Sequence, residues 1–494
     1  MSLAKDRPKG STMTEPSSGA TVAAIDIGAS SGRVVAGIIR DSTITIEVVH
    51  RFANGMRTVD GHLRWNLSGL YDEVLTGLAE LTSRYPGVVS IGIDTWAVDY
   101  GLLDGGGRLL AEPIAYRDDR TAAVIGAVDD TLSREHQYAI SGLQFLPFNT
   151  LYQLAAEQRG DQWDRTAHAV LLPDLLAYWL TGELRTEITN ASTTGLLDAR
   201  ARSWSTEAFD ALDLPTDLFP PLIEPGETLG MITAEVAERT GLPAATAVVA
   251  VGSHDTASAV VAVPAEGRDI AYVSSGTWSL VGLELDQPVI TDASRAANFT
   301  NEGGVDERVR FLRNVGGLWL LQECLRDWAA DGLESDLEVL LKSAARLTVG
   351  GPVIDVDDDR FIAPDDMPAR IRASCRAAGQ PVPDDQAGVV RCVLDSLAIA
   401  YARTVEQAEQ LTGRRAETIH VVGGGYQNAL LCQLTADRAA RPVLAGPTEA
   451  TAHGNVVVQA RTAGVLDGSL EDLRTVLRTG LELRRYEPAQ GRTG

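Results

Sequence analysis

The distribution of apolar and polar residues predicts a β-meander, a helix and a buried strand in the first part of the chain. Between residues 21 and about 51, short apolar runs alternate with Gly and Asp, which is typical of strands joined by tight turns. Residues 70–83 have the apolar spacing of a helix, and the apolar run at 88–94 predicts a buried strand. This succession indicates an α/β domain.

A similar succession begins near the middle of the chain. A buried strand at 247–251 and a helix at 256–263 are followed by the helix-breaking segment 264–267, and a new strand is expected at 270–274. Helices near 319–330, 387–411 and 428–439 and a strand at 418–422 follow. At 494 residues, the chain is long enough for two cores. We expect a terminal extension, 1–20, that is disordered or artificial, and two domains, 21–263 and 264–488.

Both parts open with a strand that ends in a Gly/Ser turn. The first reads AIDIGASSGR (24–33) and the second YVSSGTWS (272–279). In such turns, backbone amides can approach an anion, Arg33 adds positive charge, and Asp26 can hold a magnesium ion through water. For the first turn alone, an ordinary turn with Asp26 facing solvent is the alternative. The pair favours two domains that grip a nucleotide between them, as in actin-like ATPase and sugar-kinase folds.

Charge and lysine content exclude several functions. The net charge of −24 argues against nucleic-acid or anionic-membrane partners, which require a basic surface. Only Lys5, Lys9 and Lys342 are lysines, and none has the flanking glycines of a Walker-A loop. The phosphates of ATP must therefore be neutralised by a metal ion, backbone amides and arginine.

Cysteine usage favours a reducing compartment. The four cysteines, Cys324, Cys375, Cys392 and Cys432, show neither C-x-x-C pairs nor metal-ligand spacing. The chain lacks an apolar run of membrane-spanning length and a signal-peptide core. We therefore expect a cytoplasmic protein.

Asp255 is the candidate for catalysis, because it follows a buried strand and opens a helix. Phosphoryl transfer to an alcohol needs a base near the hydroxyl, which this carboxylate could supply. The alternative is a helix N-cap, a position that Asp favours. His254 is either a substrate ligand or a structural residue.

Two further segments carry polar clusters. Residues 93–100, IDTWAVDY, combine carboxylates with aromatic rings, as sugar sites do, although a plain amphipathic strand is the alternative. Residues 355–368 contain three alternating Asp but lack the Gly and Glu of a calcium loop, so we interpret them as a solvated loop. Gly423–Gly425 follow a strand and precede a helix, where backbone can approach a nucleotide. Asn428 excludes a dinucleotide fingerprint.

Taken together, the motifs resemble the FGGY family of carbohydrate kinases, and within it the rhamnulokinases. The resemblance runs from about residue 23 to 487 and rests on the runs IDIGASSGRV, HRFANG, SIGIDTWAVDYGLLD, AYRDDRT, SGLQFLPFNTLYQL, LLPDLLAYWLTG, TNASTTGL, SHDTASAV, SSGTWSL, NFTNEGG, NVGGLWLLQE, DDDRFI and HVVGGGYQN. It implies an actin-like ATPase fold, with two ribonuclease-H-like domains around a central cleft. It also implies transfer of the γ-phosphate of ATP to the 1-hydroxyl of L-rhamnulose.

Roles for individual residues follow from the resemblance. Asp255 would be the general base, and Asp26 would organise Mg²⁺. The expected ATP-binding residues are Ala29, Ser30, Ser31, Gly32, Arg33, Thr277, Gln322, Gly424 and Gly425. The expected sugar-binding residues are Ala97, His254, Asp255, Thr256 and Asn314.

Two positions depart from the family pattern. Ala97 stands where relatives usually have Gly beside the sugar, and Tyr426 stands where a small residue is usual. The sugar specificity therefore stays open between L-rhamnulose and another ketose, such as L-fuculose or L-ribulose. A non-catalytic actin-like nucleotide switch is the alternative from another class. It would need neither a base nor a sugar pocket.

Overall fold

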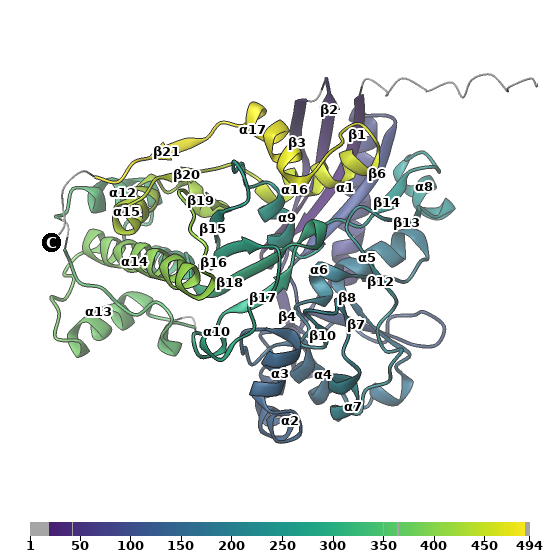
Figure 1. The fold of residues 1–494 in the computed structure, drawn as a ribbon, viewed down its shortest axis with the longest axis horizontal. Coiled ribbons are helices and arrows are strands. Elements are labelled where there is room, and N and C mark those ends of the chain that lie inside the picture. The colour runs from purple at the N-terminus through teal and green to yellow at the C-terminus, as the bar shows by residue number, and fades with distance from the viewer. Residues whose placement is uncertain (1–18, 42, 349, 363–364, 490–494) are drawn as a thin grey trace, which may run out of the picture.

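Two β-sheets of the same topology form the framework of the protein in a computed structural model, which describes residues 19–489 except 42, 349, 363 and 364 (Figure 1). The first sheet has the order β13-β14-β6-β1-β2-β3, and its strands span Thr228–Met231, Ala247–Val249, Val88–Thr95, Gly19–Ile27, Ser31–Arg40 and Thr43–Ala53. The expected extension, 1–20, lies outside the described residues except for Gly19 and Ala20, which already belong to β1.

The second sheet repeats this arrangement. Its order is β17-β18-β16-β15-β19-β20-β21, and its strands span Thr300–Gly303, Val309–Gly316, Trp278–Leu285, Ile270–Ser275, Ile419–Val422, Val443–Ala445 and Arg484–Tyr486. In both sheets, three antiparallel strands (β1-β2-β3 and β15-β16-β18) are followed by two strands parallel to the first: β6 pairs with β1 and β14 with β6, and β19 pairs with β15 and β20 with β19. The edge strand β17 of the second sheet has no counterpart in the first. This confirms the predicted duplication.

The predicted helices are present with small changes at their ends. The first of them, α1, spans Leu67–Arg84, and α9 spans Asp255–Val261. The second half contains α11 (Trp319–Ala330), α12 (Leu337–Ala345), α13 (Met367–Ala377), α14 (Gln386–Thr412) and α15 (Ala429–Ala439). A mainly helical region lies between β6 and β14 and includes α2 (Ile125–Thr131), α3 (Arg134–Ser141), α4 (Thr150–Glu157), α5 (Leu172–Thr181), α6 (Ile188–Ala191), α7 (Thr206–Ala211) and α8 (Ala234–Thr240).

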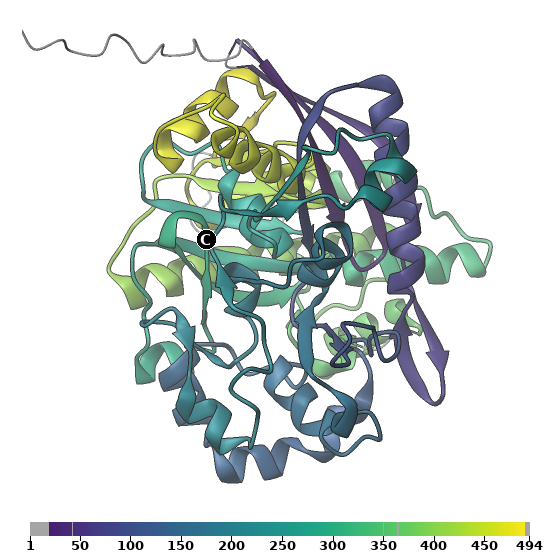
Figure 2. The same cartoon turned by 90° about the vertical axis from the view of Figure 1, so that its right-hand side faces the viewer.

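Helices from both ends of the chain cover the first sheet. Along β1, Ala23 and Ile25 pack in the core that contains α1, whereas Val22 and Ala24 pack with Val456 of α16 (Ala450–Thr462). This alternation is that of a strand buried on both faces. Figure 2 shows the yellow helices of the chain end beside the purple strands of its beginning, where α17 (Leu470–Gly480) contacts β3.

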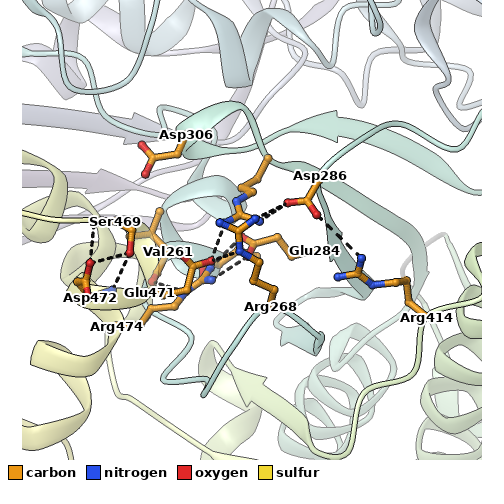
Figure 3. A network of polar contacts seen from close by, with 12 residues as sticks. Val261, Arg268, Glu284, Asp286, Asp306, Arg414, Ser469, Glu471, Asp472 and Arg474 are labelled. Carbon is orange, nitrogen blue, oxygen red and sulfur yellow. Dashed lines mark hydrogen bonds and ion pairs between the residues drawn. The ribbon is translucent and has the colours of Figure 1, made fainter.

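A buried ion pair ties α17 to the second sheet and to α9 (Figure 3). Arg474 of α17 donates from Nη1 and Nη2 to the two carboxylate oxygens of Glu284 in β16, at 2.7 and 2.8 Å. The same guanidinium donates to the carbonyl oxygens of Val260 and Val261, which end α9. Arg474 therefore joins three elements that are far apart in the sequence.

The fold also shows where two of the cysteines lie and whether a helix could span a membrane. Cys375 and Cys392 are buried thiols whose sulfur atoms lie 3.9 Å apart. Among the helices of residues 19–489 that the structure describes, none has the length and apolar composition needed to cross a bilayer.

Candidate active site

Two buried carboxylates lie side by side where β1 and β6 end. The parallel register of the two strands pairs Asp26 with Asp94. Burial raises the pKa of Asp26 to about 6, although the pairing with Arg33 opposes this, and the nearby Asp255 adds to the increase. Burial and the proximity of Asp26 raise the pKa of Asp94 well above its ordinary value. The three carboxylates are therefore close enough to repel one another.

Asp94 is positioned by a helix from the far end of the chain. Asn455 of α16 donates to Asp94 Oδ2 at 2.6 Å, and Gln459 donates to the side-chain oxygen of Asn455. A side chain at Gly92 would collide with Asn455, so glycine is needed there. The other oxygen, Asp94 Oδ1, is buried and accepts no hydrogen bond from the described residues. A cation nearby would offset the cost of this uncompensated oxygen.

The described residues contain no ready-made cluster of three or more His, Cys, Asp or Glu that would hold a metal by itself. Asp26 and Asp94 nevertheless fit a magnesium ion, because this ion keeps several waters and takes only one or two carboxylates when phosphates supply the remaining ligands. The unpartnered oxygen of Asp94 and the mutual repulsion of the acids both favour bound positive charge.

The first Gly/Ser turn is exposed but well anchored. Ala29, Ser30 and Ser31 are solvent-accessible, and the backbone N–H of Gly28 donates to the Ser31 carbonyl at 2.9 Å. Asn54 holds the turn from β3 by donating to the Gly28 carbonyl. A side chain at Gly32 would collide with the ring of Phe52. The turn can therefore present its backbone to a ligand without losing its shape.

Arg33 is already paired in this structure. Its Nη2 lies 2.6 Å from Asp26 Oδ2, and its Nε lies 2.9 Å from Glu449 Oε2, next to the start of α16. Sequence reasoning missed Glu449, because nothing in its local sequence distinguishes it from a surface acid. The structure thus links the first turn both to the carboxylate pair and to α16.

The second turn, the Gly triplet and α11 meet at the end of the second sheet. Thr277 is half-buried, and its carbonyl accepts a hydrogen bond from the backbone N–H of Trp319, at the start of α11. Gln322 is exposed on the same helix. A side chain at Gly425 would collide with Ser275, whereas Gly424 is exposed and borders open space. The predicted nucleotide-binding residues of the second half therefore gather beside β15 and β19.

Three other residues near this end have structural roles. The Tyr426 hydroxyl forms a hydrogen bond with Thr448. Asp357, in the segment interpreted as a solvated loop, is 38% exposed and accepts a hydrogen bond from the Gly316 N–H at 2.8 Å. Its side chain is exposed, as expected for a solvated loop, and its carboxylate also holds the connection between β18 and α11. Asn428 caps α15 by accepting a hydrogen bond from the Leu431 N–H.

Asp255 lies at the start of α9 with its carboxylate available. It is the first residue of the helix, and His254 occupies the N-cap position, so the N-cap alternative for Asp255 is wrong. Its side chain is 34% exposed, and its Oδ1 accepts a hydrogen bond from Thr256 Oγ1 at 3.0 Å. The Oδ1 atom also lies 3.4 Å from His254 Nε2.

His254 connects this carboxylate to the second sheet. Its Nδ1 lies 3.0 Å from Arg310 Nη2 and 3.3 Å from Glu302 Oε2. Burial would raise the pKa of Glu302, but the positive charge of Arg310 helps to hold it below its ordinary value. The sequence analysis did not single out Arg310, and it included Glu302 only as part of the run NFTNEGG, which carries the family resemblance. For Arg310, the available signal was a charged residue among the apolar positions of β18.

Ala97 lies on a strained turn beside the acids. It is half-buried, and the next residue, Val98, has a φ of 69°, which is a rare conformation for a β-branched residue. Thr150 Oγ1 and Gln153 Nε2 donate to the Val98 carbonyl and hold it in place. The methyl group of Ala97 is thus presented by a rigid turn.

Asp99 organises the aromatic residues of the same region. Its Oδ2 accepts hydrogen bonds from the indole N–H groups of Trp65 and Trp96, at 2.6 and 2.9 Å. Burial raises its pKa to about 6, which these donors oppose. The rings of Trp65, Tyr116 and Phe148 follow one another at centroid distances of 6.4 and 5.2 Å. Asp99 therefore holds an aromatic cluster together, and the rings remain candidates for sugar contact.

Two more residues bring the halves of the protein together here. Asn314 of β18 donates to the side-chain oxygen of Gln144, in the loop after α3, at 3.1 Å. The Arg117 guanidinium packs over the rings of Tyr116 and Trp319. Gln144 and Arg117 lie in runs that carried the family resemblance, but neither was singled out as a site residue.

Comparison with known proteins gives a consistent result. The profile for the N-terminal domain of the FGGY family of carbohydrate kinases matches residues 21–262, and the profile for its C-terminal domain matches residues 271–463. A rhamnulokinase from Bacteroides thetaiotaomicron is 42% identical over 94% of this chain and 95% of its own length. One from Klebsiella pneumoniae is 44% identical over 94% of both chains.

Solved structures with low sequence identity share the fold. Gluconate kinase from Lactobacillus acidophilus superposes with a TM-score of 0.77 at 15% identity, over 96% of this chain and 94% of its own. Xylulose kinase from Rhodospirillum rubrum gives 0.76 at 19% identity, over 95% and 94%. Glycerol kinase from Plasmodium falciparum with ADP gives 0.74 at 16% identity, over 96% and 95%. The predicted actin-like ATPase fold is therefore confirmed.

Proposed function

The chain belongs to the FGGY family of carbohydrate kinases, and on this premise we propose that it is a rhamnulokinase, which transfers the γ-phosphate of ATP to the 1-hydroxyl of L-rhamnulose. As a member of this family, it is a phosphotransferase that acts on a sugar hydroxyl and uses ATP. The observation that carries the choice of sugar is the identity of 42–44% to proteins named rhamnulokinase, over 94% of the chain.

In this proposal, Asp255 is the general base. Its exposed carboxylate accepts the proton of the sugar hydroxyl as the new O–P bond forms, and ADP leaves with the electron pair of the broken bond. The position of Asp255 supports this role, because it is near enough to raise the pKa of both Tyr116 of the aromatic cluster and the buried Asp26. Cleavage of the bond between the γ-phosphorus and ADP needs little help from a base. The base is needed mainly to take the proton of the sugar hydroxyl.

The remaining residues divide between the two substrates. We assign Ala29 to Arg33, Thr277, Gln322, Gly424 and Gly425 to ATP, and Ala97, His254, Thr256 and Asn314 to the sugar. The placement of the expected phosphate-binding residues supports the division, because Ala29 to Arg33 span the turn between β1 and β2 and the start of β2, Thr277 follows β15, and Gly424 and Gly425 follow β19. Asp26 and Asp94 would hold a magnesium ion, which would neutralise phosphate charge when it is bound.

The domain division and the compartment belong to the same proposal. We assign residues 21–263 to the sugar-binding domain with the base, and residues 264–488 to the domain with the second phosphate turn. The extents of the two family matches support a boundary in this region. We infer a cytoplasmic reaction, because ATP is the donor and the four cysteines are free thiols.

The test is sugar-dependent release of ADP from MgATP. L-rhamnulose, L-fuculose, L-ribulose, D-xylulose and glycerol are offered in parallel to the wild type and to Asp255→Asn. We expect the highest kcat/KM with L-rhamnulose and a loss of kcat of about 10³-fold or more in Asp255→Asn, in the upper range for a general base.

A matched control distinguishes catalysis from folding. Asp292 is also the first residue of a helix, α10 (Asp292–Ala296), but its side chain is 88% exposed, and we assign it to neither substrate site. Asp292→Asn should keep wild-type kcat. Highest turnover with another ketose would retain the mechanism and reassign the substrate. Absence of turnover with every sugar would contradict the kinase assignment.

A further inference from the structure

A buried arginine of the second sheet contacts the histidine next to the proposed base. The Arg310 side chain is 0% exposed, and Glu302 is its cross-strand partner in the β17–β18 pair. Its Nη1 lies 3.0 Å from Glu302 Oε2, and its Nε donates to the Gly303 carbonyl at 2.9 Å. These two contacts leave Nη2 directed at His254 Nδ1, 3.0 Å away.

This contact determines where the proton of His254 lies. A guanidinium can only donate, so His254 Nδ1 must accept, and a neutral imidazole then carries its proton on Nε2. Glu302 Oε2 is the other group near Nδ1, but it lies farther away, at 3.3 Å, and already pairs with Arg310. The Nε2–H group consequently faces Asp255 Oδ1 at 3.4 Å.

The orientation of Asp255 follows from this. Two donors, His254 Nε2–H and Thr256 Oγ1–H, face the same oxygen, Asp255 Oδ1. No hydrogen bond from the described part of the chain reaches Asp255 Oδ2. Oδ2 is therefore the atom left for a substrate hydroxyl, and His254, with Nε2 protonated, cannot itself take the proton.

We propose that Arg310 is a positioning residue for phosphoryl transfer, which sets the tautomer and orientation of His254 so that His254 holds Asp255 Oδ2 toward the sugar hydroxyl. This inference rests on the proposed function. It also links the base to the second sheet, because β17 and β18 belong to that sheet and β17 lies beside α6 of the first half (Figure 1). The position of the base thus depends on how the two halves are packed.

The kinetic test replaces Arg310 by Met, which removes the donor to His254. We expect kcat with L-rhamnulose to fall about 100-fold, as for the loss of a well-placed base, while the KM for MgATP stays within about twofold. Arg310→Lys restores a charged donor and should recover about tenfold of kcat. Arg391→Met is the matched control, because Arg391 is a buried arginine paired with Asp395 inside α14, and its kcat should stay at the wild-type value.

A buried acid without its partner can prevent folding, so the double variant Glu302→Leu/Arg310→Met is included. Replacing both members of a buried pair by apolar residues is often neutral for stability. The double variant should fold and show the same loss of kcat. If folded Arg310→Met or the double variant keeps kcat within twofold of wild type, the inference is overturned. The proposed function would still hold in that case, provided that the wild type phosphorylates L-rhamnulose.

A second readout does not depend on activity. ¹⁵N NMR of histidine-labelled wild type resolves the protonated nitrogen of each ring, and the chain has only seven histidines. The His254 signals are assigned from their absence in His254→Gln. We expect a neutral ring with the proton on Nε2, and a change of tautomer in Arg310→Met. A proton on Nδ1 in the wild type would overturn the inference whatever the sugar specificity.

Discussion

Adjacent glycines of the triplet differ in what surrounds them, which separates a folding role from a binding role. A side chain at Gly425 would collide with Ser275, whereas one at Gly424 would enter open space. We expect Gly425→Ala to destabilise the protein by about 1–3 kcal/mol, the usual effect of overpacking. Gly424→Ala should leave stability within about 0.5 kcal/mol and raise the KM for MgATP.

Thermal unfolding and steady-state kinetics on both variants provide the measurement. Each glycine serves as the control for the other, because they are neighbours in one turn. Equal loss of stability in the two variants would contradict the packing argument. An unchanged KM for MgATP in Gly424→Ala would remove Gly424 from the nucleotide site.

The sequence identifies some residues of the candidate site and not others. Asp255 was identifiable because a carboxylate at the junction of a buried strand and a helix is a local pattern. Glu449 and Arg310 were not, since their contacts with Arg33 and His254 bring together segments that are remote in the chain. Asp99 shows the reverse, because its local pattern indicated sugar binding while its oxygens accept hydrogen bonds from two indoles.

At the scale of elements, the C-terminal end of α9 depends on α17. Arg474 pairs with Glu284 and holds the last carbonyls of α9 (Figure 3). Arg474→Ala leaves Glu284 buried and unpaired, which should lower the free energy of unfolding by about 3–5 kcal/mol. Denaturant midpoints of wild type, Arg474→Ala and the double variant Glu284→Leu/Arg474→Met measure this.

The double variant should recover much of the lost stability, because it leaves no buried charge without a partner. The surface arginine Arg108, whose side chain is 84% exposed, provides a control, and Arg108→Ala should change stability by less than about 1 kcal/mol. A decrease in the free energy of unfolding of less than about 1 kcal/mol in Arg474→Ala would contradict the stabilising role of the Arg474–Glu284 ion pair.

Strand β19 carries a histidine that makes the fold sensitive to acid. Burial, with a smaller contribution from Arg474, lowers the pKa of His420 to about 3. Below about pH 6.5 the unfolded chain binds a proton that the folded chain does not, so stability is lost as the pH falls. Between pH 7 and 5, this histidine alone should cost about 2 kcal/mol.

The control is the variant His420→Leu, in which residue 420 has no titratable side chain. Its Nδ1 forms no hydrogen bond within the described residues, so an apolar side chain replaces it without leaving a partner unpaired. Urea unfolding at pH 7 and pH 5 should show the wild type losing about 2 kcal/mol more than the variant. The same pH dependence in both proteins would show that His420 titrates alike in the folded and the unfolded chain, contrary to the prediction.

At the scale of the whole molecule, the two halves are not independent folding units. Helix α16 comes from the C-terminal part of the chain and covers the face of the first sheet on which Val22 and Val35 lie. A fragment of residues 19–263 would expose this apolar face to water. We expect it to aggregate or to melt without cooperativity, in gel filtration and circular dichroism.

Co-expression with residues 264–489 should restore a soluble complex, because the second fragment supplies α16 and α17. A monomeric first fragment with a cooperative melting transition would contradict this dependence. The sequence pattern placed the boundary near residue 264 from a helix-breaking segment, and it contained no signal that residues 450–462 pack on the opposite half.

The local elements and the class of chemistry could be predicted from the sequence. The meander at the N-terminus, α1, α9, α11, α14 and α15 follow from periodicity and turn residues, because these properties depend on neighbours in the chain. Which residues meet depends instead on the tertiary packing. The register of β1 and β6 puts Asp26 beside Asp94, α16 brings Asn455 to Asp94, and β18 brings Arg310 to His254. Such contacts arise from the packing of sheets and helices far apart in the sequence, so no local pattern encodes them.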